Sequence, residues 1–125
     1  MKKLILIIVF LCVGVEGFGW KPDKWTMQDN ILQGSLITLN YIDTLQTFYF
    51  LSKGKKESNP ILGIKPSRKR IYLYDFITMS LHASIAYALP KKYNLRTIWQ
   101  SIYIGVVSKT IYSNCLIRSG FHIKF

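Results

Sequence analysis

At 125 residues the chain has room for one domain. Half of its residues are hydrophobic, and 17 Lys and Arg against 6 Asp and Glu give a formal net charge of +11. This balance favours anionic partners such as phospholipid headgroups, nucleic acid or an acidic protein. The two cysteines form no Cys/His cluster, and no catalytic or nucleotide-binding motif occurs, so the sequence predicts no metal site and no cofactor.

The first 17 residues have the layout of a secretory signal peptide. Lys2 and Lys3 precede an apolar stretch over 4–15, which is short for a membrane span. Val15 and Gly17 then stand at the −3 and −1 positions of a cleavage site. We therefore expect a signal at 1–17 and a mature domain at 18–125. An uncleaved anchor and a lipoprotein attached at Cys12 are the alternatives.

Three helical segments follow, separated by glycine and proline residues. They are expected at about 25–51, 71–89 and 95–115. Polar residues in the first segment recur every three or four positions, which is typical of a helix and not of a strand. Each segment is long enough to cross a bilayer. The sequence therefore predicts an all-α fold: a small helical membrane bundle of three transmembrane helices after an N-terminal signal peptide.

Each segment has one face whose side chains are more polar or smaller than those on the rest of its surface. On a helical wheel the first segment has an apolar side opposite its polar face, and the third has a small-xxx-small face that allows close helix approach in lipid. The polar face of the first segment holds Asp29, Gln33, Asn40, Asp43, Thr44 and Thr47, and its apolar side holds Ile31, Leu32, Leu39, Ile42, Leu45, Tyr49 and Phe50. The second segment places Asp75, Thr78 and His82 together, and the third Ser101, Gly105 and Ser108.

The loop over 52–70 sets the expected orientation. It carries one acid, Glu57, and seven basic residues: Lys53, Lys55, Lys56, Lys65, Arg68, Lys69 and Arg70. The positive-inside bias places this loop in the cytoplasm of a bacterium, and an export signal places the mature N-terminus outside the inner (cytoplasmic) membrane. We expect Lys53, Lys55, Lys56, Arg68, Lys69 and Arg70 to contact lipid headgroups. Nucleic-acid binding is not expected, because aromatic residues are not interleaved with the basic ones.

The candidate polar site comprises Asp43, Thr47, Glu57, Asn59, Pro60 and His82. A carboxylate in the middle of a membrane helix is costly unless it is paired, so it is a functional candidate by default. An Asp/His pair brought together across two helices could relay protons or bind a cation. Asp43, Glu57, Asp75 and His82 would also be enough ligands for a divalent metal. The simpler interpretation is that these polar side chains hydrogen-bond to one another and hold the bundle together.

Several short motifs resemble those of small uncharacterised multi-spanning membrane proteins of bacteria and their phages. In these proteins an Asp-x-x-x-Thr helix is followed by a Glu-x-Asn-Pro turn, which this chain matches at Asp43 to Thr47 and Glu57 to Pro60. The resemblance implies a multi-spanning helical protein and no catalytic residue. It also rests on Trp25-Thr26-x-x-Asp29, Gln46, Leu62-Gly63, Pro66-Ser67, His82 and Ala88-Leu89-Pro90.

The sequence thus predicts a small integral membrane protein of structural or interaction type. Membrane lipids are its expected partners, together with a membrane protein or further copies of itself. Two alternatives stay open. One is a membrane-embedded proton, ion or lipid-headgroup site built on Asp43, Glu57 and His82, and the other is an exported soluble or peripheral basic helical protein.

Overall fold

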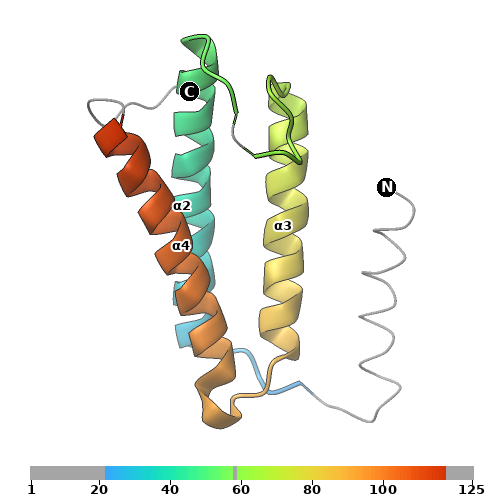
Figure 1. Cartoon of the computed structure of the whole chain (residues 1–125). Coiled ribbons are helices and arrows are strands. Elements are labelled where there is room, and N and C mark those ends of the chain that lie inside the picture. Colours follow the sequence, from blue (N-terminus) through green and yellow to red (C-terminus); the bar gives the residue numbers. More distant parts are fainter. Residues whose placement is uncertain (1–21, 58, 118–125) are drawn as a thin grey trace.

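The computed structural model describes residues 22–57 and 59–117. They form three long helices, α2 (Met27–Ser52), α3 (Arg68–Ala88) and α4 (Leu95–Ile117), and a short 3-10 helix, η1 (Lys92–Asn94). The described residues contain no strand, so the all-α prediction is confirmed. The helices run up, down and up beside one another (Figure 1). The expected signal peptide at 1–17 lies outside the described residues.

Side-chain caps fix where α2 and α3 begin. The Thr26 hydroxyl accepts from the Asp29 backbone N–H, and the Asp29 carboxylate accepts from the Thr26 backbone N–H, which is a capping box. Ser67 caps α3 by accepting from the Arg70 backbone N–H at 3.2 Å. This cap explains why α3 begins at Arg68, three residues before the expected position.

Glycine and proline fix the helix ends. Gly54 has a φ of +74°, the left-handed conformation that commonly follows a helix C-terminus, and α2 ends two residues before it. Leu89 is extended before Pro90, which is the conformation that a following proline favours, and α3 ends at Ala88. The link to α4 then turns at Tyr93 and Asn94, whose φ angles are 61° and 56°.

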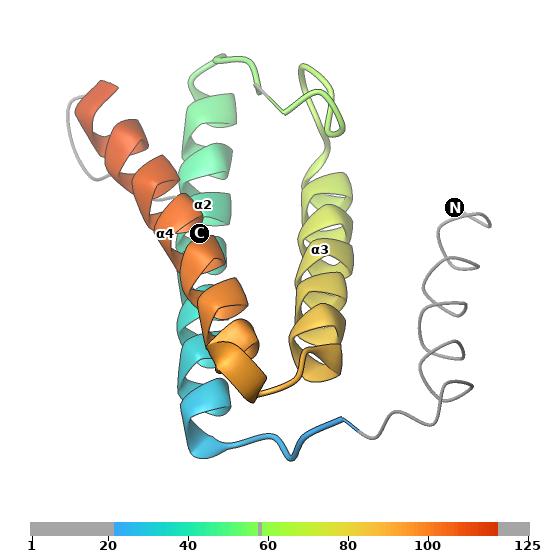
Figure 2. The same ribbon diagram turned by 60° about the horizontal axis from the view of Figure 1, so that its bottom comes forward.

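Helix α4 packs mainly against α2, while α3 makes fewer contacts with either of them. Figure 2 shows α4 leaning across the front of α2. An apolar cluster of Leu45, Phe48, Leu62 and Ile71 joins α2, α3 and the connecting loop at the end of the bundle that carries this basic loop. We call this the basic-loop end, and the end that carries Lys91 and Lys92 the opposite end.

The interior of the bundle is rich in polar groups. As predicted, the polar face of α2 turns inward, with Asp29, Gln33 and Thr44 buried. The predicted apolar outer side of α2 is correct for Ile31, which is 61% exposed, and wrong for Leu45 and Phe50, which are buried. The reason is that further residues cover the basic-loop end of α2. Leu62 of the loop and Ile71 of α3 pack with Leu45, and Lys55 of the loop lies 5.9 Å from the centre of the Phe50 ring.

The helices bear on two expectations: that each of them spans a membrane, and that the small-residue face of α4 packs closely against another helix. None of the helices in the described ranges 22–57 and 59–117 combines the length and the apolar character needed to cross a membrane. The small-residue face of α4 points away from the other helices, because Ser101, Gly105 and Ser108 are all exposed. A Cβ added at Gly105 would meet no neighbouring atom within 4 Å, so this face makes no close approach to another helix in the described residues.

Candidate functional site

The polar side chains inside the bundle fall into three groups. The first, at the opposite end, is the Arg96 clamp, formed by Arg96 and Asp29. The second, one to two turns further in, is the central triad of Gln33, His82 and Gln100. The third, towards the basic-loop end, is the carboxylate cluster of Asp43, Asp75 and Glu57.

Arg96 is the most completely engaged side chain of the bundle. It is 1% exposed, and its Nη1 lies 3.1 Å from Oδ2 of Asp29, with which it forms a buried ion pair. Nε donates to the carbonyl of Ala86 at 2.8 Å, and Nη1 also donates to that of Lys24 at 3.2 Å. Nη2 donates to three further carbonyls, those of Asp23, Tyr87 and Leu89, at 3.1–3.2 Å. Every nitrogen of the guanidinium therefore has a partner.

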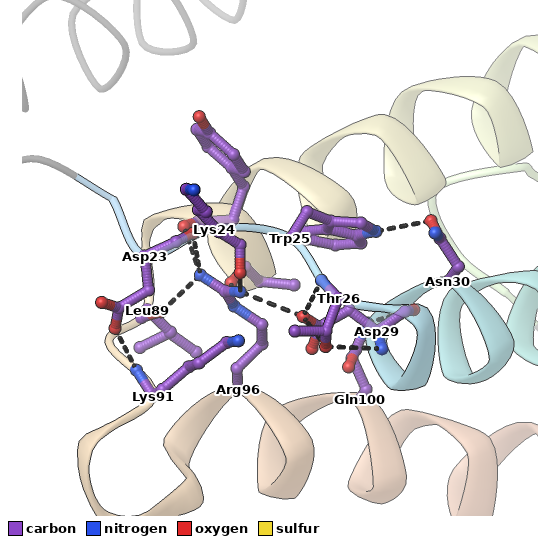
Figure 3. A network of polar contacts seen from close by, with 12 residues as sticks. Asp23, Lys24, Trp25, Thr26, Asp29, Asn30, Leu89, Lys91, Arg96 and Gln100 are labelled. Carbon is purple, nitrogen blue, oxygen red and sulfur yellow. Dashed lines mark hydrogen bonds and ion pairs between the residues drawn. The ribbon is translucent and has the colours of Figure 1, made fainter.

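The clamp joins four segments of the chain (Figure 3). The carbonyls of Ala86 and Tyr87 belong to the last turn of α3, where backbone acceptors have no partner within the helix and a cation is favoured. Those of Asp23 and Lys24 belong to the segment that leads into α2, and Asp29 belongs to α2 itself. Arg96 therefore ties the start of α2 and the end of α3 to the start of α4.

The Trp25 ring and Asp23 complete this end of the molecule. The guanidinium carbon of Arg96 lies 5.3 Å from the centre of the Trp25 ring, a cation–π arrangement. The indole N–H of Trp25 donates to Asn30 at 2.7 Å, and the Asp23 carboxylate accepts from the Lys91 backbone N–H at 2.6 Å. Side chains and backbone together thus hold the incoming segment in place (Figure 3).

The central triad joins all three helices. Nδ1 of His82, on α3, lies 3.2 Å from Oε1 of Gln33, on α2. Gln100, on α4, donates through Nε2 to the carbonyl of Asp29 at 3.2 Å. The Trp99 ring stacks on the His82 imidazole at 5.4 Å, and its N–H donates to the His82 carbonyl at 3.3 Å. Three buried polar atoms of this group have no protein partner: Gln33 Nε2, His82 Nε2 and Gln100 Oε1.

The carboxylate cluster lies at the other end of the polar interior. The Thr44 hydroxyl donates to Asp75, which links α2 to α3. Asn114 of α4 donates to Asp43 at 3.1 Å and to the side-chain carbonyl of Gln46 at 3.2 Å. The negative charges of Asp75 and Glu57 are close enough to repel that of Asp43. Unlike Asp29, Asp43 has no cationic partner within ion-pair distance in the described residues.

A small cavity opens beside Asp43. Its volume is about 80 Å³, and its walls come from α2, the loop and α4. Asp43 and Glu57 supply carboxylates, Lys56 an ammonium group, and Thr47, Thr110 and Asn114 further polar atoms. A cavity of this size could admit a few water molecules or one small charged group. The arrangement could therefore bind a small polar ligand at the basic-loop end.

The structure brings together only part of the candidate site named from the sequence. Asp43, Thr47 and Glu57 line the cavity. The Asn59-Pro60 turn adjoins it, because the Asn59 backbone N–H donates to the Glu57 carboxylate at 2.9 Å. His82 lies apart, two helical turns beyond Asp75 on α3, which is about 10 Å.

A metal site built on Asp43, Glu57, Asp75 and His82 is not assembled. In the described part of the chain, no three His, Cys, Asp or Glu side chains are grouped closely enough to hold a metal ion. The basic residues expected at lipid headgroups, Lys53, Lys55, Lys56, Arg68, Lys69 and Arg70, are all exposed on the loop or on the first turn of α3.

Sequence reasoning missed the most highly connected residues. The sequence alone assigns no role to Arg96 or to Gln100. One signal could have identified them: Arg96, Gln100, Val107 and Asn114 lie on one face of α4 at spacings of four and seven residues. A buried basic residue on that face needs an acidic partner, which the polar face of α2 supplies at Asp29.

Comparison of the chain with protein-family models, with curated proteins and with solved structures gives no match. The likeness to small bacterial and phage membrane proteins therefore stays a prediction that rests on the motifs alone.

Proposed function

We propose that this chain is a small integral membrane protein of structural or interaction type, with the outer surface of the bundle in contact with lipid. The observation that carries the proposal is the distribution of exposed charged side chains along the helices. Along α2, α3 from Ile71 onward and α4, Lys109 is the one charged side chain that is exposed in the described residues. A water-soluble surface is about 25–35% charged residues.

Large apolar side chains occupy the outer surface instead. Met27 and Ile31 of α2, Phe76 of α3 and Val106 of α4 are each more than half exposed. Polar side chains, by contrast, are as numerous as apolar ones among the buried residues. Buried polar groups and exposed apolar ones are the informative departures from a soluble fold.

The polar interior also explains the low mean hydropathy of the helices. Hydropathy averaged over all faces of a helix counts buried groups such as Asp29, Arg96 and Gln100 as if they faced lipid. At 26, 21 and 23 residues, α2, α3 and α4 are about 39, 32 and 35 Å long, which exceeds the hydrocarbon thickness of about 30 Å. Once the polar groups are shielded inside, length and surface are compatible with a membrane.

The charged residues lie at the two ends, as in a protein that crosses a membrane. Lys24, Lys91 and Lys92 are exposed at the opposite end, and the seven basic residues over 53–70 lie at the basic-loop end. We propose that the basic-loop end faces the cytoplasm of a bacterial inner membrane. Lys109, near the basic-loop end of α4, would reach the headgroups through its flexible side chain.

The test compares two lysine substitutions at exposed apolar positions. Phe76, in the middle of α3, is 71% exposed, and Ile61, in the loop, is 65% exposed, so neither change removes a buried side chain. A lysine at the centre of a membrane helix costs about 2.5–3.5 kcal/mol on insertion. We expect F76K to lower the carbonate-resistant membrane fraction several-fold and I61K to leave it unchanged. A wild-type chain washed out by carbonate, or an F76K variant that is equally well inserted, would contradict the proposal.

The cavity beside Asp43 favours a second function, the binding of a lipid headgroup that carries an ammonium group. We propose that the carboxylates of Asp43 and Glu57 face the ammonium group and that Lys56 pairs with the phosphate. Native mass spectrometry of the chain in mixed vesicle lipids would test this. D43N should reduce retained phosphatidylethanolamine relative to phosphatidylglycerol, whereas D23N, an exposed aspartate at the opposite end, should not. Equal retention in both variants would contradict it.

A further inference from the structure

The turn over 59–64 in the basic loop leaves two apolar side chains exposed. The Asn59 carbonyl accepts from the backbone N–H groups of Leu62 and Gly63 at 3.1 and 3.2 Å, and the Asn59 side-chain oxygen accepts from the Ile61 N–H at 3.0 Å. Gly63 closes the turn with a φ of +83°. Leu62 is buried in the apolar cluster, whereas Ile61 is 65% and Ile64 61% exposed. One apolar side chain thus anchors the turn, and two lie on its surface.

Further hydrogen bonds hold this turn in one conformation. The Ile64 carbonyl accepts from the Glu57 backbone N–H at 3.0 Å, and the Ile61 carbonyl accepts from Nη2 of Arg70 at 2.9 Å. Both isoleucines are therefore held through their backbone, and their side chains are not needed to form these bonds. A surface that is already ordered loses little conformational entropy when a partner binds to it.

Basic groups adjoin both isoleucines. The Arg70 guanidinium contacts the Ile61 carbonyl, and a Cβ added at Gly63 would lie 3.9 Å from its Nη1. Lys65, which follows Ile64 directly, is exposed. The one acid of the loop, Glu57, is half-buried, and its carboxylate accepts from a backbone N–H within the loop at 2.9 Å. The exposed apolar side chains therefore lie in a positively charged surface.

We propose that Ile61, Ile64, Lys65 and Arg70 form a docking site for an acidic segment of a partner protein, which contacts the isoleucines through apolar side chains of its own. Apolar contact at the centre and complementary charge around it are the usual composition of a protein interface. The Cα atoms of the two isoleucines are at most about 11 Å apart, because three residues of chain separate them, so one short segment can contact both. The inference rests on the proposed interaction role and names the class of partner.

Charge disfavours the other occupants of this surface. A second copy of the chain would bring the same positive loop against it, and like charges repel. The residues over 118–125 include Arg118 and Lys124 and no acid, so they do not complement it either. Single-stranded nucleic acid binds by stacking on aromatic side chains, whereas the exposed apolar side chains of the turn are aliphatic.

Peptide binding to the full chain in zwitterionic detergent micelles tests the site. The probe is a fluorescent peptide of alternating glutamate and leucine pairs, compared by anisotropy with one that has serine in place of leucine. We expect the leucine peptide to bind and I61S to weaken its binding about tenfold, because an isoleucine is lost from the interface while the backbone bonds of the turn remain. K65E should also weaken it. M27S and K92E, at exposed positions of the opposite end, should not.

Three results would overturn the proposal: no binding of the leucine peptide, equal binding of the serine peptide, or unchanged binding by I61S. A nitroxide at Ile64, in vesicles that contain phosphatidylglycerol, separates a protein partner from the lipid surface. We expect the label to collide with a water-soluble nickel chelate and to be shielded from it when the leucine peptide is added. A label that collides mainly with oxygen in lipid before peptide is added would overturn the proposal. Carbonate extraction tests the membrane proposal separately, so each proposal can fail without the other.

Discussion

The two ends of the polar interior use buried charge in different ways. At the opposite end, Arg96 and Asp29 are almost fully buried, and every nitrogen of the guanidinium has an acceptor. At the basic-loop end, Asp43 is half-buried, repelled by two other carboxylates and open to a cavity. Complete pairing suits a structural role, whereas incomplete pairing beside a cavity suits an exchangeable ligand. The comparison therefore predicts large stability effects at the Arg96 clamp and small ones at the carboxylate cluster.

Removing Arg96 should have the largest effect. R96M would leave the buried Asp29 without its partner and five carbonyls without their donor, and breaking a buried pair in this way costs about 3–5 kcal/mol. R96K should not rescue stability, because lysine lacks the planar fork that reaches several acceptors at once. The measurement is an unfolding titration in mixed micelles. K91M is the control, since the contact between Lys91 and Asp23 uses the Lys91 backbone N–H. Wild-type stability in R96M would refute the clamp.

A double-mutant cycle should show that the pair acts as one unit. D29N and R96M each break the same interaction, so their losses of stability should not add. The loss in the double variant should be smaller than the sum of the two single losses by about 1–3 kcal/mol. The same unfolding titration measures all four proteins of the cycle. Additive losses would mean that Arg96 stabilises the bundle through the carbonyl groups alone.

The stability lost when a helix cap is removed should depend on the end of the bundle at which the cap lies. The Thr26 hydroxyl also donates to Asp29 at 2.7 Å, so T26A would disturb the carboxylate that pairs with Arg96. Within the described ranges, the Ser67 hydroxyl makes only the bond that caps α3. We expect T26A to cost about 1–2 kcal/mol and S67A about 0.5–1 kcal/mol. Melting temperatures of the two variants provide the measurement, and a greater loss in S67A would reverse the proposed order of the two ends.

Removing the charge of Asp43 should have the smallest effect. D43N keeps an oxygen that can accept from Asn114, and it relieves the repulsion from Asp75 and Glu57. We expect the stability to rise by less than about 1 kcal/mol, because a repulsion between carboxylates is removed. A loss as large as that of R96M would show that Asp43 is a structural group and not part of an open site.

The sequence predicted the general architecture well, because that architecture follows from local patterns. Helical periodicity, Pro90 and the basic loop were enough for three helices and an inward polar face on α2. The inward burial of Leu45 and Phe50 was not predictable, because it depends on how the loop folds back. Leu62 of the loop packs against Leu45, and Lys55 of the loop lies over the Phe50 ring. The role of Arg96 was missed for a similar reason. Its acceptors are backbone carbonyls from two other segments, one of them 72 residues away in the chain, and backbone carbonyls have no sequence signature.

The residues of the candidate site were likewise grouped correctly where spacing along one helix was enough, and incorrectly where two helices had to be aligned. Asp43 and Thr47 were grouped by their spacing on one helix, and both line the cavity. His82 was grouped with them because it is a titratable residue on a polar face. That argument did not specify depth along α3, and His82 lies level with Gln33 instead.

The most direct test of the central claim is to determine whether lipid or water surrounds the outer surface of the bundle. Single nitroxide labels at Ile37, Phe76 and Ile102, which are all at least half exposed, would sample α2, α3 and α4 in turn, with Ile61 in the loop as the control. The account predicts that, in vesicles, the three helix labels collide with oxygen dissolved in lipid far more often than with a water-soluble nickel chelate, and that the Ile61 label does the reverse. Helix labels that meet the chelate as freely as the loop label does would contradict it.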